Sequence, residues 1–238
     1  MAKERLDKLI ASTGRWSRRE VKTLVREGRV LVDGRIAGSA EEKYDAESCR
    51  IAVNGEELLL RRHTYVMLHK PAGVLSATED GRGRTVLDLL TPELRKIGVF
   101  PVGRLDKDTE GLLLLTDDGE LAHALLSPKK HVDKVYYARV SGRLAPEDCA
   151  AFEAGMTLGD GLECLPAGLE ILAAGETSEC LVTLREGKFH QVKRMLAARG
   201  KPVTYLKRLS MGSLRLDDTL APGEFRLLTA AEEAQLQR

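Results

Sequence analysis

The first 50 residues alternate apolar and polar positions in a way that predicts two helices and a hairpin. A short apolar stripe at helical spacing comes first and ends at Thr13-Gly14. Ser17-Arg18-Arg19-Glu20 then has the pattern of a capping box, in which the serine hydroxyl caps a helical amide and the glutamate reaches back. The helix that follows should run to about Glu27. An Asp33-Gly34 turn then joins two short apolar strands.

The rest of the chain mixes strand and helix signals without the regular rhythm of a parallel sheet. Strands are expected at 65–68, 135–140, 181–184 and 212–216, and helices at 86–90, 120–126, 147–154 and 192–198. The pattern predicts an α+β fold. A small helix-helix-hairpin domain covers residues 1–58, a linker covers 59–64, and a mostly antiparallel mixed sheet forms a second domain over 65–238.

The composition is that of a globular protein with no sign of a membrane span or a metal site. Of 238 residues, 43% are hydrophobic and 31% are charged, and no apolar run approaches the ~20 residues of a membrane span. The start lacks the apolar core of a signal peptide, so a cytoplasmic location is expected. The four cysteines show neither Cys-x-x-Cys spacing nor a neighbouring histidine, which argues against zinc. The length of the chain and its normal apolar share argue against a disulfide framework.

The charge is unevenly distributed although the formal net charge is only +1. Residues 3–35 hold ten Lys/Arg against five Asp/Glu, and residues 185–215 hold nine Lys/Arg against Glu186 alone. In the second predicted helix, the basic residues lie opposite the apolar side. Two basic patches on a nearly neutral chain indicate a surface for a polyanion, although a charge run is also compatible with a plain solvated face.

The order helix, basic helix, hairpin over residues 3–50 resembles the S-four RNA-binding domain, a small module named for a ribosomal protein. In that family the second helix and the hairpin contact RNA. The resemblance therefore implies RNA contacts for the basic residues of this region, and the alternative is a generic helical hairpin with a soluble face. The candidates are Arg5, Arg15, Arg18, Arg19, Lys22, Arg26 and Arg29.

Residues 103–111, Gly-Arg-Leu-Asp-Lys-Asp-Thr-Glu-Gly, form the densest polar run beside an apolar run. They resemble a calcium loop that begins at Asp106, but Leu112–Leu115 occupy positions that should supply oxygen ligands. They also resemble the nucleophile loop of haloacid-dehalogenase-type phosphatases, but that loop needs an apolar strand directly before Asp106. A third interpretation is a plain surface loop in which Asp106 caps a turn.

Four ordered motifs favour a different interpretation. Gly-Arg-Leu-Asp at 103–106, followed by a leucine run and Thr-Asp-Asp-Gly, resembles the catalytic motif of pseudouridine synthases, in particular the RsuA type that acts on ribosomal RNA. Residues 69–73 are similar to the family's Asn-Lys-Pro-x-Gly segment, with His69 in place of asparagine. Lys134-Val135-Tyr136 is similar to its Lys-x-Tyr motif, and residues 186–195 are similar to its basic motif. The tail at 220–226 also fits.

The resemblance implies a reaction that breaks the bond from ribose C1′ to uracil N1 and joins C1′ to C5, with no cofactor and no metal. It assigns the catalytic carboxylate to Asp106. It assigns the cation that keeps this carboxylate ionised to Lys193, and the aromatic face that holds the flipped base to Tyr136. Whether Asp106 attacks the sugar, attacks C6 of the base or acts as a base is left open.

Two further residues follow from the resemblance as substrate contacts. Arg104 is expected near the displaced base or the backbone, and Lys70 is expected to meet phosphate, as is the basic stretch 185–215. His190 is expected to be structural, because the reaction does not need a proton shuttle at neutral pH. The expected partner is ribosomal RNA or a ribosomal assembly precursor, most specifically small-subunit 16S rRNA, and a monomer is expected. The alternatives are large-subunit 23S rRNA as substrate and an inactive RNA-binding protein.

Overall fold

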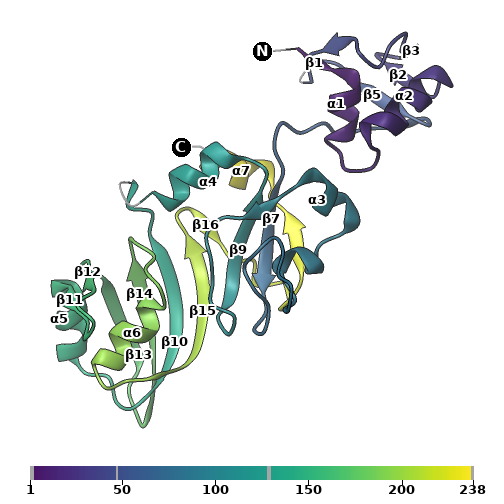
Figure 1. Ribbon diagram of the computed structural model, residues 1–238. Helices are drawn as coiled ribbons and strands as arrows, with labels where there is room; N and C mark the ends of the chain where they lie inside the picture. Colours follow the sequence, from purple (N-terminus) through teal and green to yellow (C-terminus); the bar gives the residue numbers. More distant parts are fainter. Residues whose placement is uncertain (1–2, 47, 128–129, 237–238) are drawn as a thin grey trace. The chain divides into compact units, whose positions relative to one another are not determined.

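The computed structural model of the protein describes residues 3–46, 48–127 and 130–236, and these form two compact units (Figure 1). One unit holds the described residues up to Thr64 together with Leu90–Val99, and the other holds Tyr65–Leu89 and the residues from Phe100 onward. The sequence had placed Leu90–Val99 in the second domain. Within the described residues, no helix is long and apolar enough to cross a membrane.

The first unit contains the two helices and the hairpin that the sequence predicted. Both halves of the capping box form: Ser17 Oγ accepts from the Glu20 amide at 3.3 Å, and Glu20 Oε2 accepts from the Ser17 amide at 2.7 Å. Asp33 and Gly34 both have positive φ, which the tight turn of a two-residue hairpin requires. The elements are β1 (Glu4–Arg5), α1 (Leu6–Ala11), α2 (Arg18–Arg26), β2 (Val30–Val32), β3 (Arg35–Ile36), β4 (Lys43–Tyr44), β5 (Ile51–Val53), β6 (Glu56–Glu57) and α3 (Pro92–Ile97).

The core of this unit joins the apolar sides of both helices to a small antiparallel sheet. Leu6, Val21 and Val30 are fully buried and belong to one cluster. The sheet has the order β3-β2-β5-β6, so two strands beyond the predicted hairpin complete it. Because the apolar side of α2 is used in this core, its basic side is left facing solvent.

The second unit is built on a mixed sheet with the order β13-β14-β10-β15-β9-β7-β17. The neighbouring strands along this order pair antiparallel except β15 and β9, which pair parallel, so the predicted mostly antiparallel mixed sheet is confirmed. The strands are β7 (Tyr65–Lys70), β8 (Phe100–Pro101), β9 (Glu110–Thr116), β10 (Lys134–Ser141), β11 (Met156–Thr157), β12 (Glu163–Cys164), β13 (Gly168–Ala173), β14 (Thr177–Leu184), β15 (Val203–Met211), β16 (Leu214–Arg215) and β17 (Phe225–Leu227).

Helices cover this sheet at both ends of the strand order (Figure 1). Leu125 and Leu236 come from two of these helices and join the apolar core of β7 and β9. At the other end, the buried Phe152 comes from a helix that packs on β13. The helical elements are the short 3-10 helix η1 (Val86–Leu89), α4 (Gly119–Leu126), α5 (Pro146–Ala154), α6 (Gln191–Ala198) and α7 (Ala230–Leu236).

The strand expected at 212–216 was placed too late in the chain. Only Leu214–Arg215 is a strand there, and the long strand β15 (Val203–Met211) precedes it. Lys207 and Arg208 interrupt the apolar pattern of β15, and Arg208 is nevertheless only 2% exposed. A buried cation in the middle of a strand is rare enough that pattern reasoning assigns it to the surface.

Strands β9 and β15 leave no room for a side chain at Gly111. A Cβ atom on Gly111 would lie 2.2 Å from the carbonyl oxygen of Arg208, and the φ of Gly111 is +106°. Only glycine fits such a backbone approach at that φ. Just beyond this point the Arg208 side chain donates from Nε to the carbonyl of Leu112 at 2.8 Å. The side chain of Arg208 thus adds a hydrogen bond between the two strands just where their backbone pairing ends.

We expect Gly111→Ala to lower the free energy of unfolding by at least about 2 kcal/mol, because the added methyl group collides with backbone and the φ is strained. Urea unfolding of the purified protein measures this. Gly119→Ala is the matched control, because a Cβ there meets nothing within 4 Å, and it should change stability by less than about 0.5 kcal/mol. Equal stability of the two variants would contradict the steric argument.

Candidate active site

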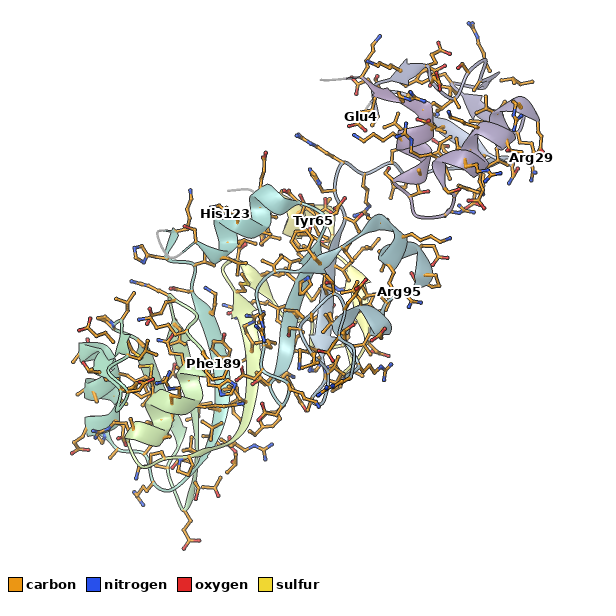
Figure 2. All side chains as sticks on the ribbon, in the orientation of Figure 1. Glu4, Arg29, Tyr65, Arg95, His123 and Phe189 are labelled. Carbon is orange, nitrogen blue, oxygen red and sulfur yellow. The ribbon has the colours of Figure 1, made fainter. Side chains whose placement is uncertain are left out.

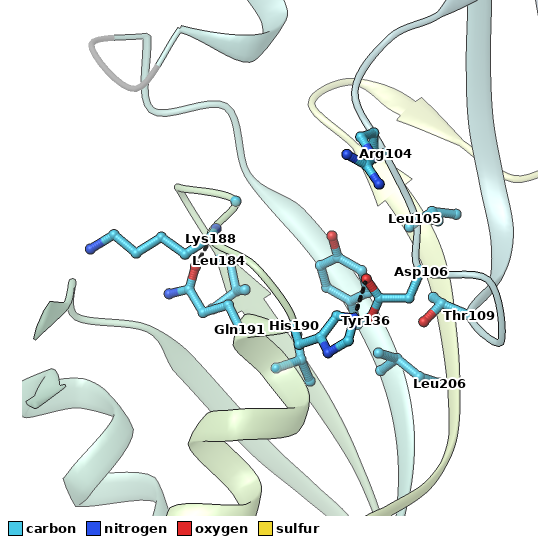
Figure 3. A pocket seen from close by; sticks show the side chains of 12 residues that line it. Arg104, Leu105, Asp106, Thr109, Tyr136, Leu184, Lys188, His190, Gln191 and Leu206 are labelled. Atoms are coloured by element: carbon cyan, nitrogen blue, oxygen red, sulfur yellow. Dashed lines mark hydrogen bonds and ion pairs between the residues drawn. The ribbon is translucent and has the colours of Figure 1, made fainter. Parts of the chain in front are cut away.

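A pocket lies where the loop before β9, the strand β10 and the start of α6 meet (Figure 3). Figure 3 shows the side chains of Asp106, Tyr136 and His190 directed toward one another from these three elements. The full lining is Arg104, Leu105, Asp106, Thr109, Tyr136, Leu184, Gly187, Lys188, His190, Gln191, Val192 and Leu206. The structure therefore brings residues from three of the four sequence motifs into one place.

Asp106 and Lys193 form an ion pair at 3.2 Å between Oδ2 and Nζ. Lys193 also holds Asp108, at a shorter 2.6 Å. Burial favours the neutral amine of Lys193, but hydrogen bonds to Asp108 and Asp106 outweigh it and raise the pKa of Lys193. The bond from Lys193 in turn lowers the pKa of Asp108. The lysine is thus a permanent cation at neutral pH, placed against the carboxylate of Asp106.

His190 lies at the site, which the sequence reasoning missed. Its Nε2 is 3.4 Å from Oδ1 of Asp106, on the opposite carboxylate oxygen from Lys193. His190 is the residue before α6 and has a left-handed backbone, with φ 52°. Helix periodicity gave no signal for it, because the residue stands outside the helix. His190 thus contacts the candidate catalytic carboxylate, and its expected structural role stays a prediction.

A buried hydrogen-bond network fixes the turn that carries His190. Gln191 Nε2 donates to Glu186 Oε1 at 2.7 Å, and its Oε1 accepts from the Lys188 amide at 3.0 Å. Glu186 Oε1 also accepts from the Leu165 amide. Glu186 and Gln191 flank the turn and are bonded to each other, so the backbone from Gly187 to His190 is held at both ends.

Tyr136 is 8% exposed and lines the pocket from β10. It stands opposite Arg208 in the register of β10 and β15, so the two side chains share one face of the sheet. Its neighbour Tyr137 points to the other face, where its ring meets Tyr205 edge-on at 6.0 Å. Because successive side chains of a strand point to opposite faces of the sheet, Tyr136 lines the pocket and Tyr137 packs on the other face, as the sequence predicted.

Arg104 also lines the pocket and is exposed, with no ion pair to any residue that the structure describes. Its guanidinium is accordingly accessible to an anion or a base, and the expected contact with the substrate stays a prediction. The Lys70 prediction does not fit. Lys70 is fully buried, and its Nζ donates to the carbonyls of Pro71, Lys107 and Thr109 at 3.0, 3.2 and 2.8 Å. An ammonium enclosed in this way holds the Asp106 loop from inside and does not reach a phosphate.

The N-terminal candidates are all at the surface of their unit, but most are bound to carboxylates. Arg5 and Arg18 both form ion pairs with the buried Asp7. Burial by itself would raise the pKa of Asp7, but the hydrogen bonds from the two arginines lower it. Arg15 pairs with Glu56. Lys22 pairs with Glu41, and Arg29 with Glu27. Among the described residues, only Arg19 and Arg26 of the seven candidates have no carboxylate partner.

Comparison with known proteins identifies the family. Residues 64–198 match the RNA pseudouridylate synthase family, and residues 4–48 match the S4 domain. An uncharacterized RNA pseudouridine synthase of Bacillus subtilis is 50% identical, covering 96% of both chains. A crystal structure of a pseudouridylate synthase superposes with a TM-score of 0.68 at 35% identity, covering 98% of this chain and 99% of the other. The chain belongs to the RNA pseudouridine synthase family, whose members are isomerases that act on RNA.

Two further relatives carry specific names. The ribosomal small subunit pseudouridine synthase A of Vibrio cholerae is 40% identical, covering 98% of this chain and 99% of the relative. The ribosomal large subunit pseudouridine synthase B of Bacillus subtilis is 39% identical, covering 98% of this chain and 96% of the relative. The family membership leaves the calcium-loop and phosphatase interpretations of residues 103–111 without support, and Leu112–Leu115 are in fact buried in β9.

We expect the free energy of unfolding of the native protein, minus that of a Lys70→Met variant, to increase as the pH rises from about 8 to 10.5. Burial lowers the pKa of Lys70 to about 8 from an ordinary 10.5, so the folded chain binds fewer protons than the unfolded chain in this window. The relative gain should reach roughly 3 kcal/mol. Urea unfolding of both proteins across this range checks it, and parallel stability curves would contradict the burial of the ammonium.

Proposed function

We propose that this protein converts a specific uridine of ribosomal RNA into pseudouridine, with Asp106 as the catalytic carboxylate. The observation that carries the proposal is the position of Asp106, ion-paired to Lys193 in a pocket that Tyr136 also lines. A carboxylate, a fixed cation and an aromatic face are the groups that this isomerisation needs. Asp106 acts at the uridine, Lys193 places a positive charge beside its carboxylate, and Tyr136 holds the flipped base.

The reaction needs nothing that the chain does not supply. The bond from C1′ to N1 breaks, the base turns, and a bond from C1′ to C5 forms. The proton that C5 loses is balanced by one that N1 gains, so substrate and product are isomers. Extruding the uridine from its stack costs a few kcal/mol, which contacts of the base with Tyr136 and of the strand with Arg104 offset.

We further propose small-subunit 16S rRNA, free or in an assembly precursor, as the substrate. The small-subunit synthase of Vibrio cholerae supports this choice through its 40% identity over nearly the whole chain. The large-subunit synthase of Bacillus subtilis, at 39% identity, supports 23S rRNA as the second candidate. A monomer working in the cytoplasm, with an RNA-binding domain over 1–58 and a catalytic domain over 65–238, completes the proposal.

Incubation of the native protein with unmodified 16S and 23S rRNA, followed by mapping of pseudouridine, tests the function and its substrate. We expect one modified uridine in 16S rRNA. A site in 23S rRNA instead would select the second candidate. No product on either RNA or on ribosomal precursors would reject the proposed activity and favour an RNA-binding protein without catalysis.

We expect Asp106→Asn to lower the rate of modification by at least about 1,000-fold while RNA affinity changes little, because the amide cannot act as the catalytic carboxylate. Asp108→Asn is the matched control. It removes the other carboxylate bound to Lys193, two residues away and exposed, and should cost less than about tenfold. Equal losses in both variants would show that the ion pair network matters and that Asp106 has no special role.

In the N-terminal unit, Arg19 and Arg26 should make the phosphate contacts. We expect Arg19→Ala and Arg26→Ala each to weaken binding of rRNA fragments and to reduce the slope of log affinity against log salt by about 0.7–0.9. Lys8→Ala on α1, which removes a lysine paired with Glu4, is the control and should leave the slope unchanged. Fluorescence titrations at several salt concentrations measure the slope. An unchanged slope in both arginine variants would exclude this face from RNA binding.

A further inference from the structure

An exposed aromatic side chain stands beside the proposed active site and has no assigned role. Phe189 is 73% exposed, and Figure 2 shows it at the start of α6. The other large apolar side chains that the structure describes as exposed are aliphatic: Ile36, Leu59, Leu126, Leu165, Leu172 and Leu227. Phe189 does not line the pocket that contains Asp106. Its ring is therefore offered to solvent next to the pocket and not inside it.

Phe189 is backed by a second ring. The rings of Phe189 and His190 stack with centroids 3.8 Å apart and planes inclined by 20°. His190 in turn contacts Asp106 through Nε2. The order of contacts is thus Phe189, His190, Asp106, which leaves the outer face of Phe189 open for another flat group.

The pair is held in place by its surroundings. The turn from Gly187 to His190 is fixed by the buried Glu186–Gln191 bond. The Lys188 ammonium is bound to the Glu163 carbonyl and, at 3.1 Å, to Glu186. Because the turn is fixed and the ring already stacks on His190, binding of a further flat group orders little additional structure in the protein.

We propose that Phe189, backed by His190, is a stacking platform for a nucleobase next to the target uridine in the RNA strand. This rests on the proposed function. Every nucleobase has a π face, and stacking on an aromatic side chain is a main source of affinity for unpaired nucleotides. The base on Phe189 is not the reacting one, because reacting atoms must come within about 3.5 Å of each other and His190 separates Phe189 from Asp106.

Substitutions at Phe189 distinguish stacking from simple packing. The assay is modification of the rRNA that the native protein modifies, with kcat and KM measured separately. We expect Phe189→Ala to raise KM for RNA by about 5- to 150-fold, which corresponds to about 1–3 kcal/mol of stacking. Phe189→Tyr and Phe189→Trp should stay within about threefold of native. Phe189→Leu keeps the apolar bulk without the π face and should resemble Phe189→Ala.

Leu172→Ala on β13 is the matched control, because it shortens another exposed apolar side chain of the same unit, 49% exposed. It should leave KM unchanged. The platform would be overturned by a native KM in either Phe189→Leu or Phe189→Ala. It would also be overturned if Leu172→Ala raised KM as much as Phe189→Ala does.

A second measurement separates this proposal from the proposed activity. Phe189→Trp introduces a fluorophore on the platform, and the native protein with Trp16 supplies the background. Adding ribosomal RNA should quench the added emission, whereas the emission of a Leu172→Trp protein should not change. Quenching in a protein that makes no pseudouridine would reject the activity and keep the platform. An active protein without quenching would overturn the platform alone.

Discussion

The parallel pairing of β9 with β15 is the interaction on which the catalytic unit depends. It joins two halves of the sheet. One half includes β9, which follows the loop that carries Asp106. The other half includes β10 with Tyr136 and β15, which contacts α6, the helix that carries Lys193. Only two residue pairs form this parallel pairing. One of them includes Gly111, where any side chain would collide with the backbone of Arg208. Arg208 extends the joint with a side-chain bond to Leu112. Because the proposed site spans the two halves, its geometry is set by how closely these two strands approach.

The Asp106 loop is held by cations on two sides. Inside, the buried Lys70 gathers the carbonyls of Lys107 and Thr109, so the loop backbone curves around an ammonium. Outside, Lys193 binds the carboxylates of Asp106 and Asp108. A third attachment is Ser76, whose Oγ bonds both the carbonyl and the amide of the buried Leu105. The two lysines thus fix the loop from both sides, and Lys193 places a positive charge beside Asp106.

Much of the fold followed from local pattern. The Ser17 capping box and the Asp33-Gly34 turn depend on a few neighbouring residues, and both formed as predicted. The strand β15 escaped prediction because its buried Arg208 is stabilised by a partner 96 residues away, which no window of sequence contains. The same reason explains Lys70. Its side chain looks like a phosphate contact in sequence, and only the path of residues 107–109 around it makes it internal.

For the site, the sequence by itself determined which residue types were present and in what order, and so the family and the proposed site residues Asp106, Tyr136 and Lys193. Those residues are named by motifs, because their chemistry depends on residue type. The tertiary structure alone decided where they stand: Lys193 shared between two carboxylates, His190 added beside Asp106, Lys70 removed from the surface. These outcomes rest on distances between segments far apart in the chain, and such distances are fixed by packing and not by local periodicity.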